Sequence, residues 1–460
     1  MPQSASNFLP LEENAPPLSV TVAGARSKPL EAPRFGCAFS GAYEAVVRLR
    51  KAIPVAHAGG GCVFNSQLGL FRAGGSQGVG YAGGTTTPSC NLLEKEVVFG
   101  GEDRLREQIK GTLELMEGDL YVVLGACIPA MIGDDVASVV REFRDETGAP
   151  LIHVNVPGFA GSSYNGYELL LKAVIEQFLE RPTEKIRGLV NIIGIPPGLN
   201  PFWKGTYKEL NRLLNRLGLK ANLLFGPNDD VDSLKKLSAA ELTVVVNPWL
   251  GVEAARLLEE RFGVPYLVYP HIPVGPEATG EFLRSLQARL TLSPRKVARI
   301  IKEEEFETYW RLDQNADAVA MLSASLPFAV VADASTVLGI TRYLVNEAGF
   351  IPGLAVITDN PPESARELID EQFDILEQGL RPEVIYEEDT FHIQNILKER
   401  NFGLLLASSL EKFLQTGVPF VQLTVSYPTN DRLIIDRSYA GYGGGINLLE
   451  DIFGKFIMPF

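Results

Sequence analysis

The stretch from Leu120 to Phe143, LYVVLGACIPAMIGDDVASVVREF, decides the fold class of this chain. Its apolar start, Leu120 to Leu124, predicts a buried strand. Apolar residues three or four apart then predict one amphipathic helix, with Asp134 and Asp135 in its first turn, where the helix dipole favours carboxylates. In an open α/β sheet, ligands bind at the carboxyl ends of the strands. Cys127 occupies such an end and is therefore the first candidate for chemistry.

Apolar strands alternate with amphipathic helices along most of the chain beyond residue 96. The expected strands are Leu120 to Leu124, Leu151 to Asn155, Leu189 to Gly194, Ala221 to Phe225, Leu242 to Asn247, Tyr266 to Tyr269, Phe328 to Ala332, Leu354 to Thr358, Val384 to Tyr386, Leu404 to Ala407 and Phe420 to Val425. Buried strands that alternate with helices of about a dozen residues predict doubly wound parallel sheets. We therefore expect an α/β protein with three Rossmann-like domains.

The rhythm of the chain suggests where these domains begin and end. Residues 1–33 are rich in Pro, Ser and Glu and are expected to form an irregular arm. A first α/β domain that carries the cysteines would span residues 34–185, and a second would span residues 186–325. The second would end in a long charged helical connector, Pro294 to about Leu322. Residues 326–460 would form the third α/β domain.

Composition excludes several classes of function. The net charge of -14, without a cluster of Lys and Arg, argues against a nucleic-acid surface. No run of about 18 apolar residues appears, so no membrane span is expected. The N-terminus lacks the pattern of a signal peptide, and the cytoplasm is the expected compartment. Four cysteines are too few for a disulfide scaffold, so important thiols are expected to be ligands or catalytic groups.

Three cysteines share one kind of setting. Cys37, Cys62 and Cys127 each lie in a turn of small residues beside an apolar element, 25 and 65 residues apart. Small neighbours let a bulky inorganic group approach the backbone, and thiolates hold iron tetrahedrally. Burial as small apolar side chains explains the three cysteines equally well from the residues alone. Structural zinc sites usually contain a closely spaced pair of cysteines, which this chain lacks.

Other chemical motifs are weak or missing. Cys90 is expected not to be a ligand, and His57, just before the glycines 59–61, is better explained as a satisfied core histidine than as a residue that orients the Cys62 loop. No GxSxG or GxGxxG motif has the required context. The nearest phosphate-loop candidate, Gly275 to Phe282, lacks the Lys and Ser/Thr that contact phosphates and Mg²⁺. If ATP is used, another protein is expected to handle it.

Several segments, in order, resemble the component 1 subunits of nitrogenase and of nitrogenase-like reductases. These are FGCAFSGAYEAV, HAGGGC, EKEVVFGGEDRLREQI, CIPAMIGDD, GFAGSSYNGYE, PHIPVGPEATGEFL and PTNDRLIIDRSYAGYGGG, which together cover nearly the whole chain beyond the arm. The resemblance implies that Cys37, Cys62 and Cys127 bind an iron-sulfur cluster at the interface with a partner subunit. It places Ser162 near this cluster, a position that Ser163 could share.

The resemblance also separates two types of subunit. The α-type binds the catalytic cofactor through a cysteine in its middle domain and a histidine near its C-terminus. This sequence has no cysteine after Cys127, and the corresponding segments read VVVNPWLG and RSYAGYGGG. The chain therefore resembles the β-type subunit, which relays electrons and would contain no catalytic residue of its own.

The same resemblance implies a cluster type and a set of partners. Three thiolates here and three from a homologous α-type subunit would hold an 8Fe-7S cluster of the P-cluster type, with a 4Fe-4S cluster as the alternative. An α2β2 heterotetramer is expected, with electrons supplied by a separate homodimeric iron-sulfur protein that hydrolyses ATP. Departures from nitrogenase in the segment after HAGGGC favour methylthio-alkane reductase, which cleaves carbon-sulfur bonds. The alternatives are a divergent nitrogenase, a tetrapyrrole reductase and a non-catalytic scaffold for cofactor assembly.

Overall fold

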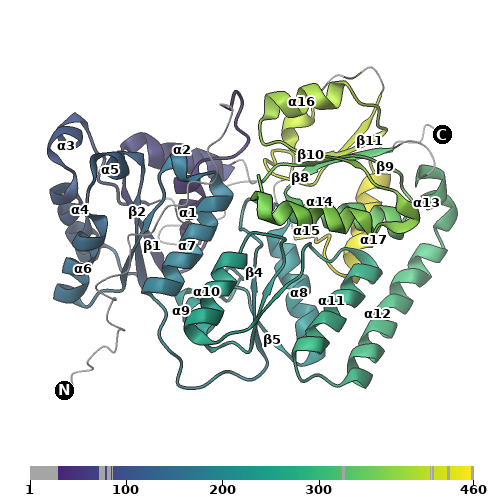
Figure 1. Cartoon of the computed structure of the whole chain (residues 1–460), viewed down its shortest axis with the longest axis horizontal. Helices are drawn as coiled ribbons and strands as arrows, with labels where there is room; N and C mark the ends of the chain where they lie inside the picture. Colours follow the sequence, from purple (N-terminus) through teal and green to yellow (C-terminus); the bar gives the residue numbers. More distant parts are fainter. Residues whose placement is uncertain are drawn as a thin grey trace.

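The fold contains three parallel β-sheets, each flanked by helices (Figure 1). The computed structural model describes residues 30–71, 78, 79, 84, 86–323, 327–414, 416, 419–432 and 436–456. The α/β class with parallel doubly wound sheets, predicted from the alternating pattern, is confirmed. The expected arm, residues 1–33, lies outside the described residues except for residues 30–33. The predicted domain boundaries near residues 185 and 325 stay predictions.

The first sheet has the strand order β1-β2-β3 and carries helices on both faces. Its elements are β1 (Ala52–His57), β2 (Leu120–Gly125), β3 (Leu151–Asn155), α1 (Ala38–Val47), α4 (Glu102–Leu115), α6 (Val136–Thr147) and α7 (Ser163–Gln177). Neighbouring residues of a strand point to opposite faces. Val122 of β2 accordingly packs in the core with α1 and α7, whereas Val123 packs in the core with α4 and α6. Both faces are buried, which explains the continuous apolar run.

The single helix predicted after Cys127 is wrong, because the structure divides it in two. Helix α5 (Cys127–Ile132) ends at Gly133, whose φ of 82° is the left-handed conformation that terminates helices. Helix α6 begins at Val136, and Asp135 caps it by accepting a hydrogen bond of 2.9 Å from Ser138 N. Asp134 therefore lies between the helices and not in the first turn of one.

The second sheet has the order β5-β4-β6-β7. Its elements are β4 (Leu189–Ile193), β5 (Lys220–Asn222), β6 (Leu242–Val245), β7 (Tyr266–Val268), α8 (Trp203–Leu217), α9 (Val231–Lys235), α10 (Val252–Phe262) and α11 (Gly275–Arg289). The strand expected from Ala221 to Phe225 is too long at its end. It stops at Asn222 because Leu224 has a φ of 69°, which no extended strand adopts.

The charged connector predicted from Pro294 is also divided. Helix α12 (Pro294–Asp313) is followed by α13 (Ala316–Ser323), and Figure 1 shows the two at one side of the molecule. The guanidinium of Arg212 on α8 lies 2.6 Å from the carboxylate of Glu304 on α12. Helix α12 of the connector therefore packs against α8, and it also contacts α11 and α17.

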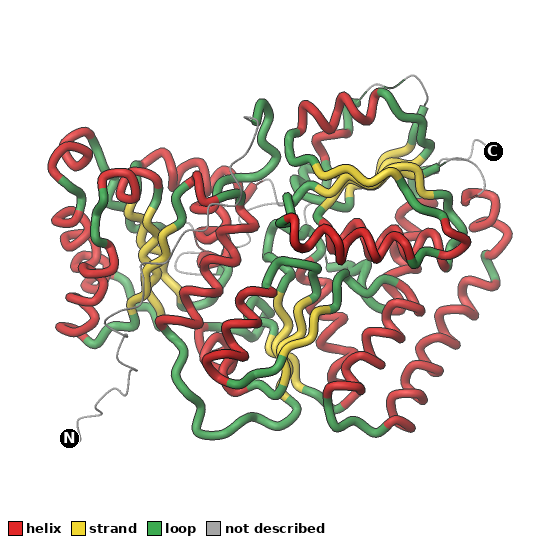
Figure 2. Tube along the Cα trace, in the orientation of Figure 1, coloured by secondary structure: helices red, strands yellow, loops and turns green. Residues whose placement is uncertain are grey.

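The third sheet has the order β10-β9-β8-β11-β12, and all of its strands are parallel. The chain adds β9 and β10 on one side of β8 and then β11 and β12 on the other. Figure 2 shows this sheet with helices on both of its sides. Its elements are β8 (Phe328–Ala332), β9 (Pro352–Ile357), β10 (Glu383–Tyr386), β11 (Leu404–Ala407), β12 (Val421–Thr424), α14 (Ala334–Asn346), α15 (Glu363–Asp374), α16 (Thr390–Lys398) and α17 (Tyr442–Phe453). None of the helices in the described part of the chain is long and apolar enough to cross a membrane.

Candidate functional site

Cys127 lies at the carboxyl end of β2, as the first residue of α5. Its sulfur accepts a hydrogen bond of 3.0 Å from the backbone N–H of Gly158, in the 3₁₀ turn Gly158–Ala160. A Cβ at position 158 would lie 3.2 Å from this sulfur and 3.5 Å from Cβ of Cys37. Only a glycine allows the backbone to approach both cysteines so closely. Sequence reasoning missed Gly158, because nothing in its local context predicts this contact.

Cys37 and Ser162 lie side by side on paired backbone segments. They face each other across an isolated antiparallel bridge, with Ala38 N donating to Gly161 O at 2.9 Å and Ser163 N donating to Gly36 O at 2.9 Å. Cys37 precedes α1, and Ser162 precedes α7. The two helices begin at this bridge and pack against each other.

The packing of α1 on α7 depends on two glycines at close approaches. A Cβ at Gly41 would lie 1.8 Å from Ser163 O, and a Cβ at Gly166 would lie 1.9 Å from Ala38 O. Both distances are far below any real contact, so neither position can accept a larger residue without separating the helices. The close packing fixes the position of Cys37 relative to Ser162.

The two serines differ in their surroundings. Ser162 Oγ donates to Asn165 Oδ1 at 3.3 Å, and the pair forms a capping box at the start of α7. The Ser163 hydroxyl is fully buried and has no hydrogen-bond partner among the described residues. It lies behind Gly36, where an added Cβ would be 3.1 Å away.

Cys62 is the third residue of α2 (Gly60–Phe71) and donates its backbone N–H to Gly59 O at 3.0 Å. Burial raises the pKa of the Cys62 thiol, and negative charge on Cys37 and Cys127 raises it further. The structure thus brings the three predicted cysteines together, although they are distant in sequence. All three are half-buried, so the face that they form is open to a further group.

Four helix N-termini converge at this site. Cys37 and Ser162 cap α1 and α7, while Cys62 and Cys127 lie in the first turns of α2 and α5. The positive ends of helix dipoles stabilise thiolates, which are the form of cysteine that binds metals. Within the described residues, no three His, Cys, Asp or Glu side chains are close enough to ligate a single metal ion. The arrangement instead leaves thiols spread around a common face.

Cys90 is placed apart from this face. It is fully buried, its sulfur lies 3.2 Å from Nδ1 of His57, and burial raises the pKa of its thiol to about 12. His57 is fully buried as well, and its Nε2 lies 2.8 Å from Asp134 Oδ2. Both ring nitrogens of His57 therefore have partners, which agrees with its interpretation as a satisfied core histidine. The part played by Asp134 was not predicted.

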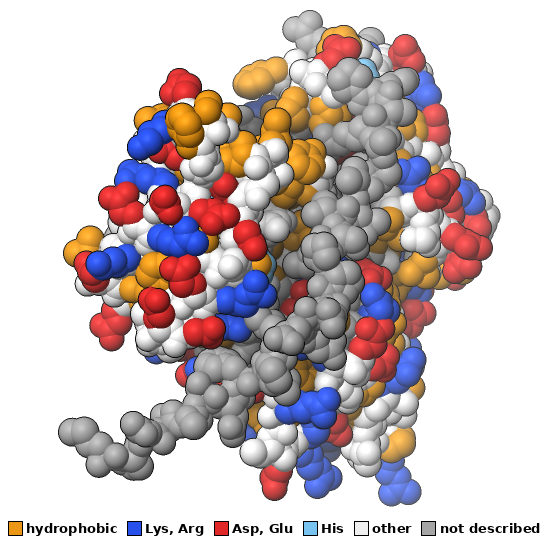
Figure 3. Space-filling view, turned by 60° about the vertical axis from the view of Figure 1, so that its left-hand side comes forward, with side chains coloured by type: hydrophobic (Ala, Val, Ile, Leu, Met, Phe, Trp, Pro, Cys, Tyr) orange, Lys and Arg blue, Asp and Glu red, His pale blue; other side chains and the backbone are white. Residues whose placement is uncertain are grey.

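Exposed apolar side chains lie on the elements that carry the cysteines and on their neighbours. In Figure 3 hydrophobic side chains gather along the upper edge of the molecule, at the end of the first domain. The exposed members come from α2, from α3 (Glu94–Phe99), from α5 and from the 3₁₀ turn: Phe64, Leu68, Phe71, Leu93, Val97, Val98, Phe99, Met131 and Phe159. Phe99 is 82% exposed, and contiguous exposed apolar side chains typically mark an interaction surface. We call this set the apolar rim.

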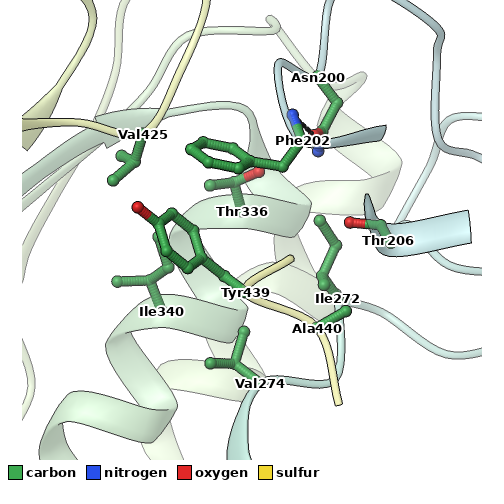
Figure 4. A pocket seen from close by; sticks show the side chains of 10 residues that line it. All are labelled: Asn200, Phe202, Thr206, Ile272, Val274, Thr336, Ile340, Val425, Tyr439 and Ala440. Carbon is green, nitrogen blue, oxygen red and sulfur yellow. Dashed lines mark hydrogen bonds between the residues drawn. The ribbon is translucent and has the colours of Figure 1, made fainter. Parts of the chain in front are cut away.

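The junction of the domains contains little free space. Figure 4 shows Phe202 and Tyr439 next to each other in the lining of a cavity of about 20 Å³, which has room for about one water molecule. Their ring centroids are 4.3 Å apart. Trp249, in the segment VVVNPWLG, donates its indole N–H to Asp359 Oδ2 at 2.7 Å. Trp249 and Tyr439 thus lie in the two segments, VVVNPWLG and RSYAGYGGG, that contain neither a cysteine nor a histidine.

A larger cleft of about 610 Å³ lies between α8, α12 and the start of α17. It is lined by paired charges such as Lys208 with Asp436 and Arg212 with Glu304. None of the four cysteines lines it, so it is separate from the thiol face.

Comparisons with known proteins agree with this architecture. The family model of the nitrogenase component 1 type oxidoreductases matches residues 37–457, and the chain belongs to this family. It is 24% identical to the nitrogenase molybdenum-iron protein beta chain of Clostridium pasteurianum, over 91% of this chain and 92% of that one. It is 27% identical to the corresponding beta chain of Methanothermobacter marburgensis, over 91% and 93%. Within the family it is a chain of the β type.

Two further comparisons extend the picture. The nitrogenase iron-iron protein beta chain of Rhodobacter capsulatus is 25% identical, over 91% of this chain and 92% of that one. The solved structure of nitrogenase Cp1 at pH 6.5 superposes with a TM-score of 0.77 at 21% identity and covers 94% of each chain. The three-sheet fold is therefore the fold of a nitrogenase component.

Proposed function

We propose that this chain is the electron-relay subunit of a nitrogenase-like reductase, in which Cys37, Cys62 and Cys127 bind an iron-sulfur cluster. The observation that carries the proposal is the convergence of these three half-buried thiols at helix N-termini on one face. Thiolates are the usual ligands of such clusters. An 8Fe-7S cluster of the P-cluster type is our first choice, with a 4Fe-4S cluster as the alternative.

The residues of the face fit such a group. The N–H of Gly158 already donates to the Cys127 sulfur, and hydrogen bonds of this kind tune the potential of a cluster. Gly158 also leaves open the space that a side chain would fill. Ser162 is buried next to Cys37, within reach of the same face. When bound, the cluster would supply one-electron redox chemistry.

The open side of the thiol face supports a shared site. Three half-buried thiols leave cluster ligands to be supplied from outside. The part of the apolar rim on α2 and the 3₁₀ turn, which leaves α3 free, is suited to burial against another protein. We propose a homologous α-type subunit as the chain that completes the site, within an α2β2 heterotetramer. Burial between the two chains would exclude water from the thiols.

The electron donor is proposed to dock on the same end of the molecule. Helix α3 carries Val98 and Phe99, exposed by 71% and 82%, and it contacts α5, which begins at Cys127. As the resemblance to nitrogenase component 1 implies, the donor would be a homodimeric iron-sulfur protein that hydrolyses ATP. This sequence has no complete phosphate loop of its own. Partner contact at α3 would bring the donor close to the cysteines.

The substrate is proposed to be a methylthio-alkane, whose carbon-sulfur bond the α-type partner would cleave. The identities to molybdenum-iron, iron-iron and vanadium-iron beta chains all lie between 24% and 27%, so they favour none of these three types. A divergent nitrogenase, a tetrapyrrole reductase and a cofactor-assembly scaffold are the competing functions.

The test begins with iron and sulfide analysis of the complex, purified without oxygen after co-expression with an α-type chain and an ATP-hydrolysing iron-sulfur protein from the source organism. We expect Cys62→Ala to lose cluster iron. Cys90→Ser, which keeps a hydrogen-bond donor to His57, should retain it. Equal iron in both variants would contradict the ligand assignment.

The second step separates the competing functions. The loaded complex should release a thiol and a hydrocarbon from a methylthio-alkane when reductant and ATP are supplied. Ammonia from dinitrogen would identify a nitrogenase, and reduction of a tetrapyrrole would identify that class. Full iron loading without turnover of any of these substrates would favour the scaffold.

A further inference from the structure

A buried histidine lies between two buried partners behind the thiol face. His57 Nε2 is 2.8 Å from Asp134 Oδ2, and Nδ1 is 3.2 Å from the sulfur of Cys90. The imidazole is 0% exposed and the carboxyl group is 3% exposed. A buried set of polar groups with every atom paired holds its members in one arrangement.

The positions of the protons follow from the chemistry of the three groups. Burial lowers the pKa of His57 and raises that of Cys90 to about 12, so the imidazole and the thiol are both neutral near pH 7. The carboxylate of Asp134 can only accept, so Nε2–H donates to it. Nδ1 is then the acceptor, and the Cys90 S–H donates to it. This arrangement satisfies all three groups with a single tautomer.

The network is not a nucleophile site, although it contains the residue types of a Cys-His-Asp triad. Cys90 is fully buried, and a thiol with a pKa of about 12 forms almost no thiolate near pH 7. The imidazole faces a thiol that donates to it and not one that it could deprotonate. The network of His57, Cys90 and Asp134 therefore has a structural role, which depends on the segments that it connects.

His57 and Asp134 connect the two loops that carry Cys62 and Cys127. His57 is the last residue of β1 and lies five positions before Cys62. Asp134 lies seven positions after Cys127, just beyond the end of α5. The backbone of the two loops is joined as well, because Ala126 N donates to His57 O at 3.1 Å.

The second oxygen of Asp134 reaches a third segment. Oδ1 accepts a hydrogen bond of 2.9 Å from Gly101 N, two residues after the exposed Phe99. A Cβ at position 101 would lie 2.6 Å from Asp134 Oδ2 and 3.0 Å from Cε1 of His57. The glycine is therefore needed for this approach. One carboxylate thus holds the end of α3 and, through His57, the start of the Cys62 loop.

We propose that His57 and Asp134 are positioning residues that hold the Cys62 and Cys127 thiols in the geometry of the cluster and link both loops to helix α3. The inference rests on the proposed function for the identity of the bound group. The network itself concerns only residues of this chain. Neither residue forms a hydrogen bond with the thiol of Cys62 or Cys127, so each acts on these thiols through the backbone of its loop.

The test compares His57→Gln and Asp134→Asn with the matched control Asp135→Asn. Asn is as good a helix cap as Asp. The Asp135 side chain accepts from Ser138 N in α6, and its backbone N–H, which the substitution keeps, donates to Glu102 Oε1. Amide hydrogen exchange is measured on the full chain over residues 58–62 and 126–133, with β8 as an internal reference. The cluster midpoint potential and EPR spectrum are measured on the loaded complex.

We expect the two network variants to exchange about 10- to 100-fold faster in both loops, because a buried hydrogen bond to a charged group is lost. Their midpoint potential and EPR spectrum should change, and those of Asp135→Asn should not. Wild-type exchange rates in both variants would overturn the proposal, and so would faster exchange with an unchanged potential. A wild-type complex without iron would refute the proposed function, whereas the exchange data would still decide whether the network holds the loops.

Discussion

The backbone N–H of Gly158 donates a hydrogen bond of 3.0 Å to the sulfur of Cys127, across 31 residues of sequence. This contact joins the carboxyl end of β2 to the turn that leads into α7. It also brings the backbone against Cys37, since a Cβ at position 158 would be 3.5 Å from the Cβ of that residue. The position of two thiols thus depends on the absence of one side chain.

Gly158→Ala should therefore weaken cluster binding. The added methyl group would lie 3.2 Å from the Cys127 sulfur. Overpacking of this kind typically destabilises the folded state by about 1–3 kcal/mol, because neighbouring groups must shift. We expect a lower iron content per chain after anaerobic purification. The control is Gly61→Ala, next to Cys62, where an added Cβ has no atom within 4 Å. Equal loss of iron in both variants would show that the site is sensitive to any alanine and not to this contact.

Substitution of the apolar rim should weaken partner binding without loss of stability. Phe99→Asp places a charge on a side chain that is 82% exposed, so the free energy of unfolding should change by less than about 0.5 kcal/mol. The affinity for the ATP-hydrolysing donor, measured by biolayer interferometry, should fall at least tenfold. Phe413→Asp is the control, because Phe413 is 86% exposed in the third domain. A similar affinity for both variants would move the docking site away from α3.

Trp249→Phe should destabilise the junction between the second and third domains. The indole N–H donates to Asp359 Oδ2 at 2.7 Å, and its removal leaves a buried carboxylate oxygen without this partner. Such a loss costs about 1–3 kcal/mol. Denaturant unfolding should show a lower midpoint for this variant. Trp310→Phe, on the 56% exposed indole of α12, should leave the midpoint unchanged.

Strand positions could be predicted well because a strand buried on both faces is a continuous apolar run. Leu151–Asn155, Phe328–Ala332 and Leu404–Ala407 were predicted with their exact bounds. The errors arise where a backbone dihedral, and not a side chain, ends an element. Gly133 and Leu224 both have positive φ, and the sequence pattern on either side continues through them.

The site could be predicted only in part. Cysteine spacing alone could not show that Cys37, Cys62 and Cys127 meet, and the resemblance to a known family supplied that expectation. The contact of His57 with Asp134 could not be predicted, because the two are 77 residues apart and Asp134 was expected in the first turn of a helix. Glycines such as Gly158 and Gly101 were missed because their role depends on the atoms that approach them in space.

Glu168 should make stability depend on pH through the contact between the first two domains. This glutamate of α7 is half-buried, and its carboxyl group accepts hydrogen bonds from Gly251 N and Ala254 N, at the start of α10. Burial raises the pKa of its carboxyl group from 4.5 to about 7. The folded state therefore keeps a proton that the unfolded state releases above pH 4.5. The contribution of protonated Glu168 to the stability of the folded state is complete below pH 4.5 and is lost as the pH rises through about 7.

Between pH 4.5 and pH 8, the free energy of unfolding of the wild type should accordingly fall by about 1–3 kcal/mol relative to that of Glu168→Gln. Glutamine keeps an acceptor for the two N–H groups but cannot titrate. The free energy of unfolding, measured with urea at steps of pH, gives the difference between the two proteins. Glu259→Gln, on the exposed face of α10, should follow the wild type at every pH. A difference between the wild type and Glu168→Gln that is constant with pH would mean that Glu168 is ionised in the folded protein throughout.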